Sequence, residues 1–230
     1  NGEYGYQLYI KIIQEENKMK VVTAIDSFKG SMTSMEAGFA AAEGIHRVDA
    51  DAEVQVRPLA DGGEGTVEAL VAGMNGKTEH VKVTGPLGEP VICEYGIIES
   101  TKTAVIEMAS CAGLPLVEDR KDPRKTTTYG VGQLILAAAE SGVEKIIVGL
   151  GGSSTNDGGC GAAAAVGVKF YDKDGKEFVP TGGTTADICK IDLSGKAEIL
   201  NKVEIVTMCD IDNPMYGPTG ASHIFGPQKG

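Results

Sequence analysis

The sequence predicts an α/β protein in which short buried strands alternate with helices. Three stretches show the order strand, polar loop, helix, and they begin at Lys20, Glu53 and Lys145. Each strand is a short apolar run, and the loop after it combines glycine with polar residues, an order typical of parallel sheets. The 230 residues are enough for one large or two small domains with a sizeable core.

The first of these stretches comprises a strand at 20–25 and a helix that opens at a capping box, Thr33 with Glu36. Residues 1–18 differ in composition from the rest of the chain, since they hold three of the seven tyrosines and no alanine. We interpret them as a remnant of cloning or of a mis-set start codon. The alternative is a genuine extra strand, because apolar residues alternate there.

The second stretch predicts a strand at 53–59 and a helix at 66–74. The pattern then changes to strand-like runs with few helices between them, at 81–84, 91–98 and 103–108. We therefore expect a domain boundary near 76–84. Residues 19–80 would be the N-terminal part of a Rossmann-like domain, and 81–230 a second α/β domain.

The third stretch continues to the end of the chain. Its expected elements are a helix at 131–140, a strand at 145–148, a glycine-rich loop at 149–159, a helix at 160–166, a hairpin within 169–178 and a strand at 203–208.

Charge and composition exclude several classes of function. The chain has 21 basic and 32 acidic residues, a formal net charge of −11, which argues against nucleic acid and against an anionic membrane surface. No run approaches the roughly 20 apolar residues of a membrane-spanning helix. The five cysteines form no CxxC pattern, so we expect reduced thiols and a cytoplasmic protein.

The 32 glycines are about twice the usual share, and many lie in loops that come directly after strands. Ligands of open α/β sheets bind past the carboxyl ends of strands, where glycine lets the backbone approach an anion. We therefore expect the loops that begin at Asp26, Asp61, Gly149 and Asp210 to converge on one cleft between two domains.

The loop 149–159 is the richest of the four. Its backbone and side chains could cradle phosphate, and the candidates are Gly151, Gly152, Ser153, Ser154, Thr155 and Asn156. Asp157 is its only charged residue, which suits a proton acceptor or a magnesium ligand; the alternative is a turn with an aspartate helix cap. The Walker A, dinucleotide GxGxxG and hydrolase GxSxG patterns do not occur in this loop.

The remaining loops supply acids and cations. Lys29 is a candidate anion holder beside Asp26 and Ser27, with a helix-capping turn as the alternative. Asp61 and Glu64 lie among three glycines, where a plain acidic first helical turn is the alternative. Asp210 and Asp212 lie two positions apart just after the last predicted strand, so both could face one ion, or one of them could cap a turn.

Together these loops resemble the bacterial glycerate kinase family of the glycerate 2-kinase type. The resemblance runs from about Met19 to Gly230 and rests on DSFKGS at 26–31, ADGGEGT at 60–66, TTYG at 127–130, GLGGSSTNDGG at 149–159, and CDIDNP at 209–214 with FGPQKG at 225–230. Family members continue well beyond Gly230, so the resemblance implies that the C-terminal part of the first domain is absent here.

The resemblance implies a two-domain α/β enzyme that uses ATP and Mg²⁺ to phosphorylate D-glycerate. In such proteins both chain ends form one Rossmann-like domain and a second is inserted between them. The product would be 2-phosphoglycerate, with 3-phosphoglycerate left open. The oligomeric state also stays open, a homodimer being one option.

Roles can be assigned from the chemistry of phosphoryl transfer, which needs positioning, charge neutralisation and a proton acceptor. We assign Asp157 as the base and Lys29 as the second catalytic residue. Lys29 or Arg57 would hold the carboxylate of glycerate, and Asp210 with Asp212 would hold magnesium. The rival hypotheses are a kinase for another hydroxy or sugar acid, and a non-catalytic nucleotide- or metabolite-binding module.

Overall fold

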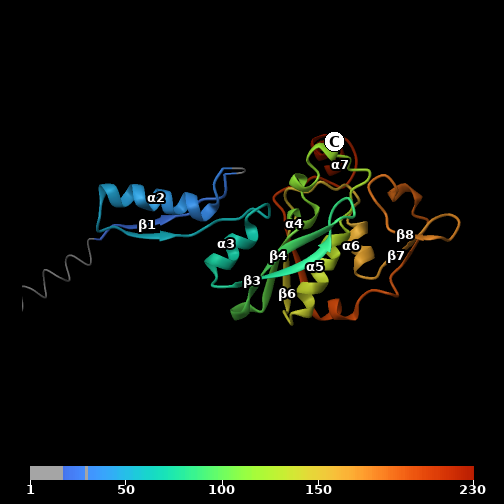
Figure 1. The fold of residues 1–230 in the computed structure, drawn as a ribbon, viewed down its shortest axis with the longest axis horizontal. Helices are drawn as coiled ribbons and strands as arrows, with labels where there is room; N and C mark the ends of the chain where they lie inside the picture. The colour runs from blue at the N-terminus through green and yellow to red at the C-terminus, as the bar shows by residue number, and fades with distance from the viewer. Residues whose placement is uncertain (1–17, 29–30) are drawn as a thin grey trace, which may run out of the picture. The chain divides into compact units, whose positions relative to one another are not determined.

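The structure is a computed structural model that describes residues 18–28 and 31–230 (Figure 1). The expectation for residues 1–18 therefore falls, except for Lys18, outside the described residues. The chain divides into two compact units, one ending at Leu59 and the other comprising Ala60–Gly230.

The first unit pairs two strands in parallel and connects them through a helix. Strand β1 is Lys20–Thr23, helix α2 is Ser34–Val48 and strand β2 is Glu53–Val56. The predicted capping box is confirmed: the Glu36 N–H donates to Thr33 Oγ1 at 3.2 Å, and Glu36 Oε2 accepts from the Thr33 N–H at 2.8 Å. A Cβ at Gly38 would lie 2.4 Å from Val56 Cγ1, so glycine lets α2 approach β2 closely.

The second unit contains a mixed five-stranded sheet with the order β10-β6-β5-β4-β3. The strands are β3 (Lys77–Thr84), β4 (Pro90–Ile98), β5 (Thr103–Glu107), β6 (Lys145–Gly149) and β10 (Glu204–Met208). Strands β5, β6 and β10 are parallel, whereas β3, β4 and β5 are antiparallel. The short connections between these three strands allow only antiparallel pairing, because a parallel pair needs a crossover.

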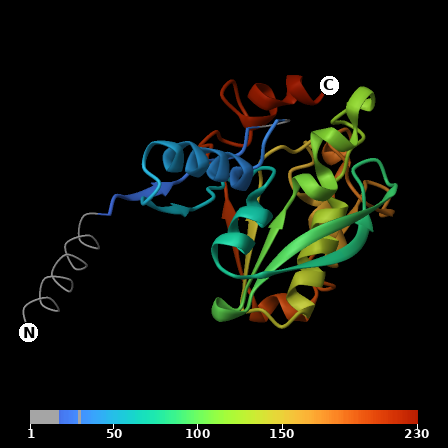
Figure 2. The same ribbon diagram turned by 60° about the vertical axis from the view of Figure 1, so that its left-hand side comes forward.

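Two helices cover the opposite faces of this sheet (Figures 1 and 2). Ala104 and Ile106 of β5 join the core shared with α5 (Tyr129–Glu140), whereas Val105 joins the core shared with α3 (Thr66–Gly73). This alternation matches the two-residue period of a strand. Since β5 is buried on both faces, it is the centre of the unit.

Helix α3 precedes residue 80 and strand β3 begins before it, yet both pack into the second unit, where α3 contacts β4 and β5. The boundary between the compact units along the chain therefore falls between residues 59 and 60. The division into domains at residues 18 and 80 stays a prediction. Helix α3 begins at Thr66, as expected, and its N-cap is Gly65 in the left-handed conformation.

The remaining elements are small. They are helices α4 (Ala109–Ala112), α6 (Cys160–Ala165) and α7 (Ala221–Phe225), and a three-stranded sheet of β7 (Lys169–Tyr171), β8 (Glu177–Phe178) and β9 (Lys190–Asp192). The 3₁₀ helices are Glu99–Thr101, Leu114–Leu116, Glu118–Arg120, Thr185–Asp187, Glu198–Lys202 and Gly226–Lys229. Antiparallel pairing of β7 with β8 confirms the predicted hairpin. Within residues 18–28 and 31–230, no helix has the length and apolarity to cross a membrane.

Candidate functional site

Three of the four expected loops lie together in the second unit, at the carboxyl ends of β6 and β10. The Gly151 N–H donates to Gly62 O at 2.9 Å, and the Leu150 N–H donates to Met208 O at 3.1 Å. A Cβ at Gly149 would lie 2.5 Å from Gly62 O. These glycines therefore allow one loop backbone to pack directly on another.

The fourth loop belongs to the first unit. Asp26 is half-buried and its Oδ1 accepts from the Ser27 N–H at 2.7 Å, while Lys29 lies outside the described residues. Arg57 is exposed and donates to Gln55 Oε1 at 3.3 Å. The convergence of these residues with the other three loops stays a prediction.

The glycine-rich loop uses some of its polar groups internally and leaves others open. Ser154 is fully buried, and both its N–H and its hydroxyl donate to Ala112 O. The Gly151 N–H is committed to Gly62 O. The N–H groups of Gly152 and Ser153, in contrast, have no backbone acceptor within the described part of the chain. The loop therefore offers donors to a ligand at these two neighbouring residues.

The other two candidate phosphate contacts also have partners within the protein. Thr155 is buried, and Asn156 Oδ1 accepts from Ser222 Oγ at 2.9 Å. This bond joins the glycine-rich loop to α7.

Asp157 connects the starts of two helices. Its side chain is 1% exposed, and Oδ2 accepts from the N–H and the hydroxyl of Thr128, both at 2.8 Å. Oδ2 also accepts from the Gly161 N–H at 3.2 Å, and Oδ1 from the Gly159 N–H at 3.1 Å. Asp157 thus holds α5 beside α6 with a carboxylate that already accepts four hydrogen bonds.

Glu107 is a buried carboxylate that the sequence analysis missed. It ends β5 on the face toward α3, and its Oε1 accepts from the Val67 N–H at 2.6 Å. Burial raises the pKa of Glu107, and the backbone N–H groups of 65–67 offset only part of this effect. The available signal was a single charged residue directly after the apolar residues Ala104–Ile106 of a predicted strand. Glu107 fixes the loop that contains Asp61 by capping the helix that comes after it.

Lys229 is a second residue without a predicted role. It lies in the 225–230 segment that contributed to the family resemblance, and it is 8% exposed. Its Nζ donates to Ser153 Oγ and to Thr155 O, both at 2.7 Å. Burial lowers the pKa of Lys229, while the charge of Asp157 acts in the opposite direction.

The candidate acids of the Asp61 and Asp210 loops are exposed. Asp61 Oδ1 accepts from the Gly63 N–H at 2.8 Å, and Glu64 lies in the same loop. Asp210 and Asp212 are exposed after β10, and no ion pair joins either to a described lysine or arginine. No group of three metal-ligating side chains gathers among the described residues.

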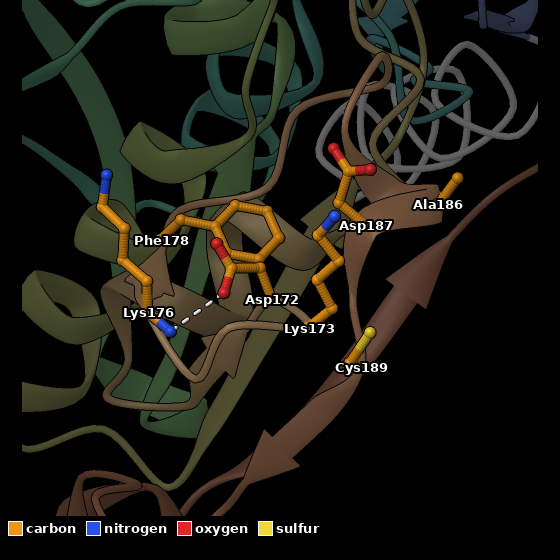
Figure 3. A pocket seen from close by; sticks show the side chains of 7 residues that line it. All are labelled: Asp172, Lys173, Lys176, Phe178, Ala186, Asp187 and Cys189. Atoms are coloured by element: carbon orange, nitrogen blue, oxygen red, sulfur yellow. Dashed lines mark hydrogen bonds between the residues drawn. The ribbon is translucent and has the colours of Figure 1, made fainter.

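A separate hollow of about 420 Å³ lies on the β7–β8 hairpin and is shown in Figure 3. Asp172, Lys173, Lys176 and Phe178 line it from the hairpin, and Ala186, Asp187 and Cys189 from the segment before β9. Asp172 Oδ1 accepts from the backbone N–H groups of Asp174 and Lys176, and so shapes the turn. The hollow contains no predicted site residue and presents charges of both signs.

Comparisons with known proteins give one consistent result. The family model described as the glycerate kinase family matches residues 21–230. A glycerate kinase of Bacillus subtilis (strain 168) is 47% identical over 213 residues, and a glycerate 2-kinase of Escherichia coli (strain K12) is 48% identical over 213 residues. Each alignment covers 92% of this chain and 56% of the relative.

A solved structure has a similar fold. A crystal structure of a proposed glycerate kinase 2 from Salmonella typhimurium LT2 matches with a TM-score of 0.83 and 45% sequence identity. The match covers 93% of this chain and 57% of that one. The chain therefore spans a little more than half the length of the relatives that it matches.

Proposed function

Since the chain belongs to the glycerate kinase family, we propose that it forms part of a kinase that transfers a phosphoryl group from ATP to D-glycerate. The product would be 2-phosphoglycerate. One observation carries the proposal: three strand-end loops of the second unit pack on one another and present open N–H donors at Gly152 and Ser153. Such donors suit the oxygens of a phosphate chain.

The phosphate contacts are proposed at Gly152 and Ser153 in particular. Gly151 and Ser154 donate their N–H groups to carbonyl oxygens of neighbouring segments, so they shape the loop around those contacts. Thr155 and Asn156 bind the C-terminal segment and have the same supporting role.

Proton transfer requires a carboxylate that the substrate hydroxyl can reach. Asp157 is the first candidate for this role, but its oxygens already accept four hydrogen bonds in a buried position. Asp61 is exposed, and its loop bonds directly to the glycine-rich loop. The surroundings thus favour Asp61 as the acceptor and Asp157 as an anchor, and the Asp157→Asn variant separates the two assignments.

The carboxylate of glycerate needs a cation, and Lys29 and Arg57 are proposed for it. Asp26, Ser27 and Glu64 complete the proposed substrate contacts. The assignments of Asp26, Ser27, Lys29 and Glu64 rest on the family motifs at 26–31 and 60–66. Arg57 lies outside these motifs and is proposed as a cation on the second strand.

The donor set after β10 fits a magnesium ion. Mg²⁺ takes oxygen ligands and is commonly held by one or two carboxylates together with substrate phosphates. Asp210 and Asp212 are exposed and form no ion pair with a described cation, so both would be available. When bound, the ion would neutralise charge on the phosphate oxygens.

A cytoplasmic location belongs to the same proposal, and the oligomeric state stays open, with a homodimer as one option. The experiment uses the protein at its full natural length with ATP, Mg²⁺ and a panel of D-glycerate and other hydroxy acids. Formation of ADP that depends on D-glycerate is expected, with the phosphate position assigned by NMR. Preference for another acid would support the rival kinase. Nucleotide binding without turnover of any acid would support a non-catalytic binding module.

A further inference from the structure

Lys229 places a buried ammonium directly against the glycine-rich loop. The residue is 8% exposed, and its Nζ lies 2.7 Å from both Ser153 Oγ and Thr155 O. Lysine is seldom buried to this extent unless it is paired. The position of Lys229 therefore calls for a partner of opposite charge.

The described residues satisfy that need only in part. Asp157 is the carboxylate whose charge acts on Lys229, but its oxygens already accept hydrogen bonds from Thr128, Gly159 and Gly161. The two atoms that accept from Nζ are a hydroxyl oxygen and a carbonyl oxygen, and neither carries a formal charge. An ammonium has three N–H donors, so one remains for a further acceptor.

The bond to Lys229 also fixes the direction in which Ser153 can donate. An ammonium cannot accept, so Ser153 Oγ must be the acceptor in the bond between them. The hydroxyl hydrogen of Ser153 then points elsewhere, and it has no acceptor among residues 18–28 and 31–230. Ser153 is thus held as a donor, beside its own N–H and that of Gly152, which also lack backbone acceptors there.

Simple geometry brings these donors to one ligand. An oxygen that accepts from the Ser153 hydroxyl lies about 2.7 Å from Oγ. Since Nζ is 2.7 Å from the same Oγ, that oxygen lies roughly 4 to 5 Å from the ammonium at a tetrahedral angle. An anion bound by Ser153 would therefore be within short electrostatic range of Lys229.

We propose that Lys229 and Ser153 form an anion-binding pair, in which the ammonium holds the Ser153 hydroxyl as a donor and compensates the charge of a bound polyphosphate. The inference rests on the proposed function only for the identity of the anion, the phosphate chain of ATP. The competing explanation is that Lys229 has only a structural role, in which its two hydrogen bonds hold the 226–230 segment against the glycine-rich loop.

Tripolyphosphate is the probe, because it offers the charge of the phosphate chain without a nucleoside. Its affinity is measured by calorimetry for the full-length protein and for Lys229→Met, Ser153→Ala and the double variant. Lys196→Met is the matched control, since Lys196 is an exposed lysine of the same unit.

A second measurement uses the unsubstituted protein. NMR of the lysine side chains monitors the pKa of Lys229 with and without tripolyphosphate.

We expect Lys229→Met to weaken tripolyphosphate binding about 10- to 100-fold, because it removes a buried positive charge roughly 4 to 5 Å from the bound anion. Ser153→Ala should weaken binding about 3- to 10-fold. The double variant should lose less affinity than the product of the two single fold-changes, because the two side chains act together. The control should bind as the unsubstituted protein does. Saturation with the probe should raise the pKa of Lys229, because a nearby anion favours the charged form.

Unchanged affinity in a folded Lys229→Met variant would overturn the proposal, and so would an unsubstituted protein that does not bind tripolyphosphate. If Lys229→Met does not fold, Ser153→Ala and the pKa measurement decide: normal affinity together with an unmoved pKa rejects the pair. Failure of the proposed function looks different. In that case the probe binds through Lys229, but no hydroxy acid is phosphorylated.

Discussion

The carboxylate of Glu107 accepts a hydrogen bond from the Val67 N–H at 2.6 Å, across 40 positions of sequence. Glu107 ends the central strand β5, and Val67 lies in the first turn of α3, so the bond ties the start of the helix to the sheet. The segment that leads into α3 carries Asp61 and packs on the glycine-rich loop. A buried side chain thus determines where an exposed acid of the candidate site lies.

The stability of the protein should depend on pH through Glu107. Burial raises the pKa of Glu107 above its ordinary value of 4.5, so the folded state holds this proton more tightly than the unfolded state does. Protonated Glu107 therefore contributes its whole stabilising effect below about pH 4.5, the ordinary pKa of the group. This contribution to the free energy of unfolding is lost as the pH rises through the raised pKa of the folded state. Glu107→Gln cannot titrate, and we expect its stability relative to the unsubstituted protein to increase across that range.

Urea denaturation of both proteins between pH 4 and pH 8 measures this difference. Glu107→Leu is the companion variant, because it also removes the charge but leaves the Val67 N–H without an acceptor. We expect it to be about 1–3 kcal/mol less stable than Glu107→Gln. A difference between Glu107→Gln and the unsubstituted protein that stays flat with pH would contradict a raised pKa.

Asp157→Asn tests whether this residue is an anchor or a base. Aspartate accepts four hydrogen bonds through two oxygens, and an asparagine NH₂ would face at least one of the same donors. We expect the free energy of unfolding to fall by roughly 2–4 kcal/mol. Exposed Asp187→Asn is the control and should stay within about 0.5 kcal/mol. A base role gives the opposite result, a kcat lower by about 10²–10⁴-fold with unchanged stability.

Gly151→Ala should disturb the contact between two loops. A Cβ at this position would lie 2.7 Å from Gly63 Cα, which is backbone and cannot move aside alone. We expect a loss of about 1–3 kcal/mol in stability, measured by thermal or chemical denaturation. Gly73→Ala is the matched control: it lies in α3 with nothing within 4 Å of its Cβ, and it should be neutral or slightly stabilising. Equal stability of the two variants would show that the loops can separate freely.

Asp210→Asn should raise the Mg²⁺ concentration needed for half-maximal activity of the full-length protein. Losing one charged oxygen ligand weakens a magnesium site, and we expect a shift of at least about tenfold with little change in stability. The measurement is the initial rate against free Mg²⁺ at saturating ATP. Asp174→Asn, on the exposed β7–β8 turn, serves as the control. An identical Mg²⁺ dependence in both variants would place the ion elsewhere.

Local patterns in the sequence predicted much of this fold. The capping box at Thr33, the hairpin after Lys169 and the strands of the central sheet are all visible in short windows of sequence, and the structure confirms them. Strand β9 was missed because its three residues, Lys190–Asp192, are too few and too polar to form a pattern. Strand patterns alone do not encode direction, and the signal for the antiparallel half of the sheet lies in the short connections 85–89 and 99–102.

The candidate site could be predicted only in outline. Glycine-rich loops after strands indicated which segments meet, and the loops after β6 and β10 lie together because the ends of these parallel strands share an edge. The Asp61 loop follows β2 of another sheet and joins them through the bond from the Gly151 N–H to Gly62 O. The roles within the loops depend on distant partners. Lys229 bonds to Ser153 across 76 positions, and Asp157 bonds to Thr128 across 29. No local window contains such pairs, so the sequence alone could not distinguish committed donors from open ones.

The mixed sheet has a consequence for the order in which the protein folds. Strands β3, β4 and β5 are joined by the short connections 85–89 and 99–102, whereas β10 pairs with β6 only after the long excursion 150–203. Contacts between residues close in sequence form sooner, because closing a longer chain segment costs more entropy. The meander should therefore form early and β10 should dock late. The edge that gathers the three loops would thus be the last part of the sheet to be completed.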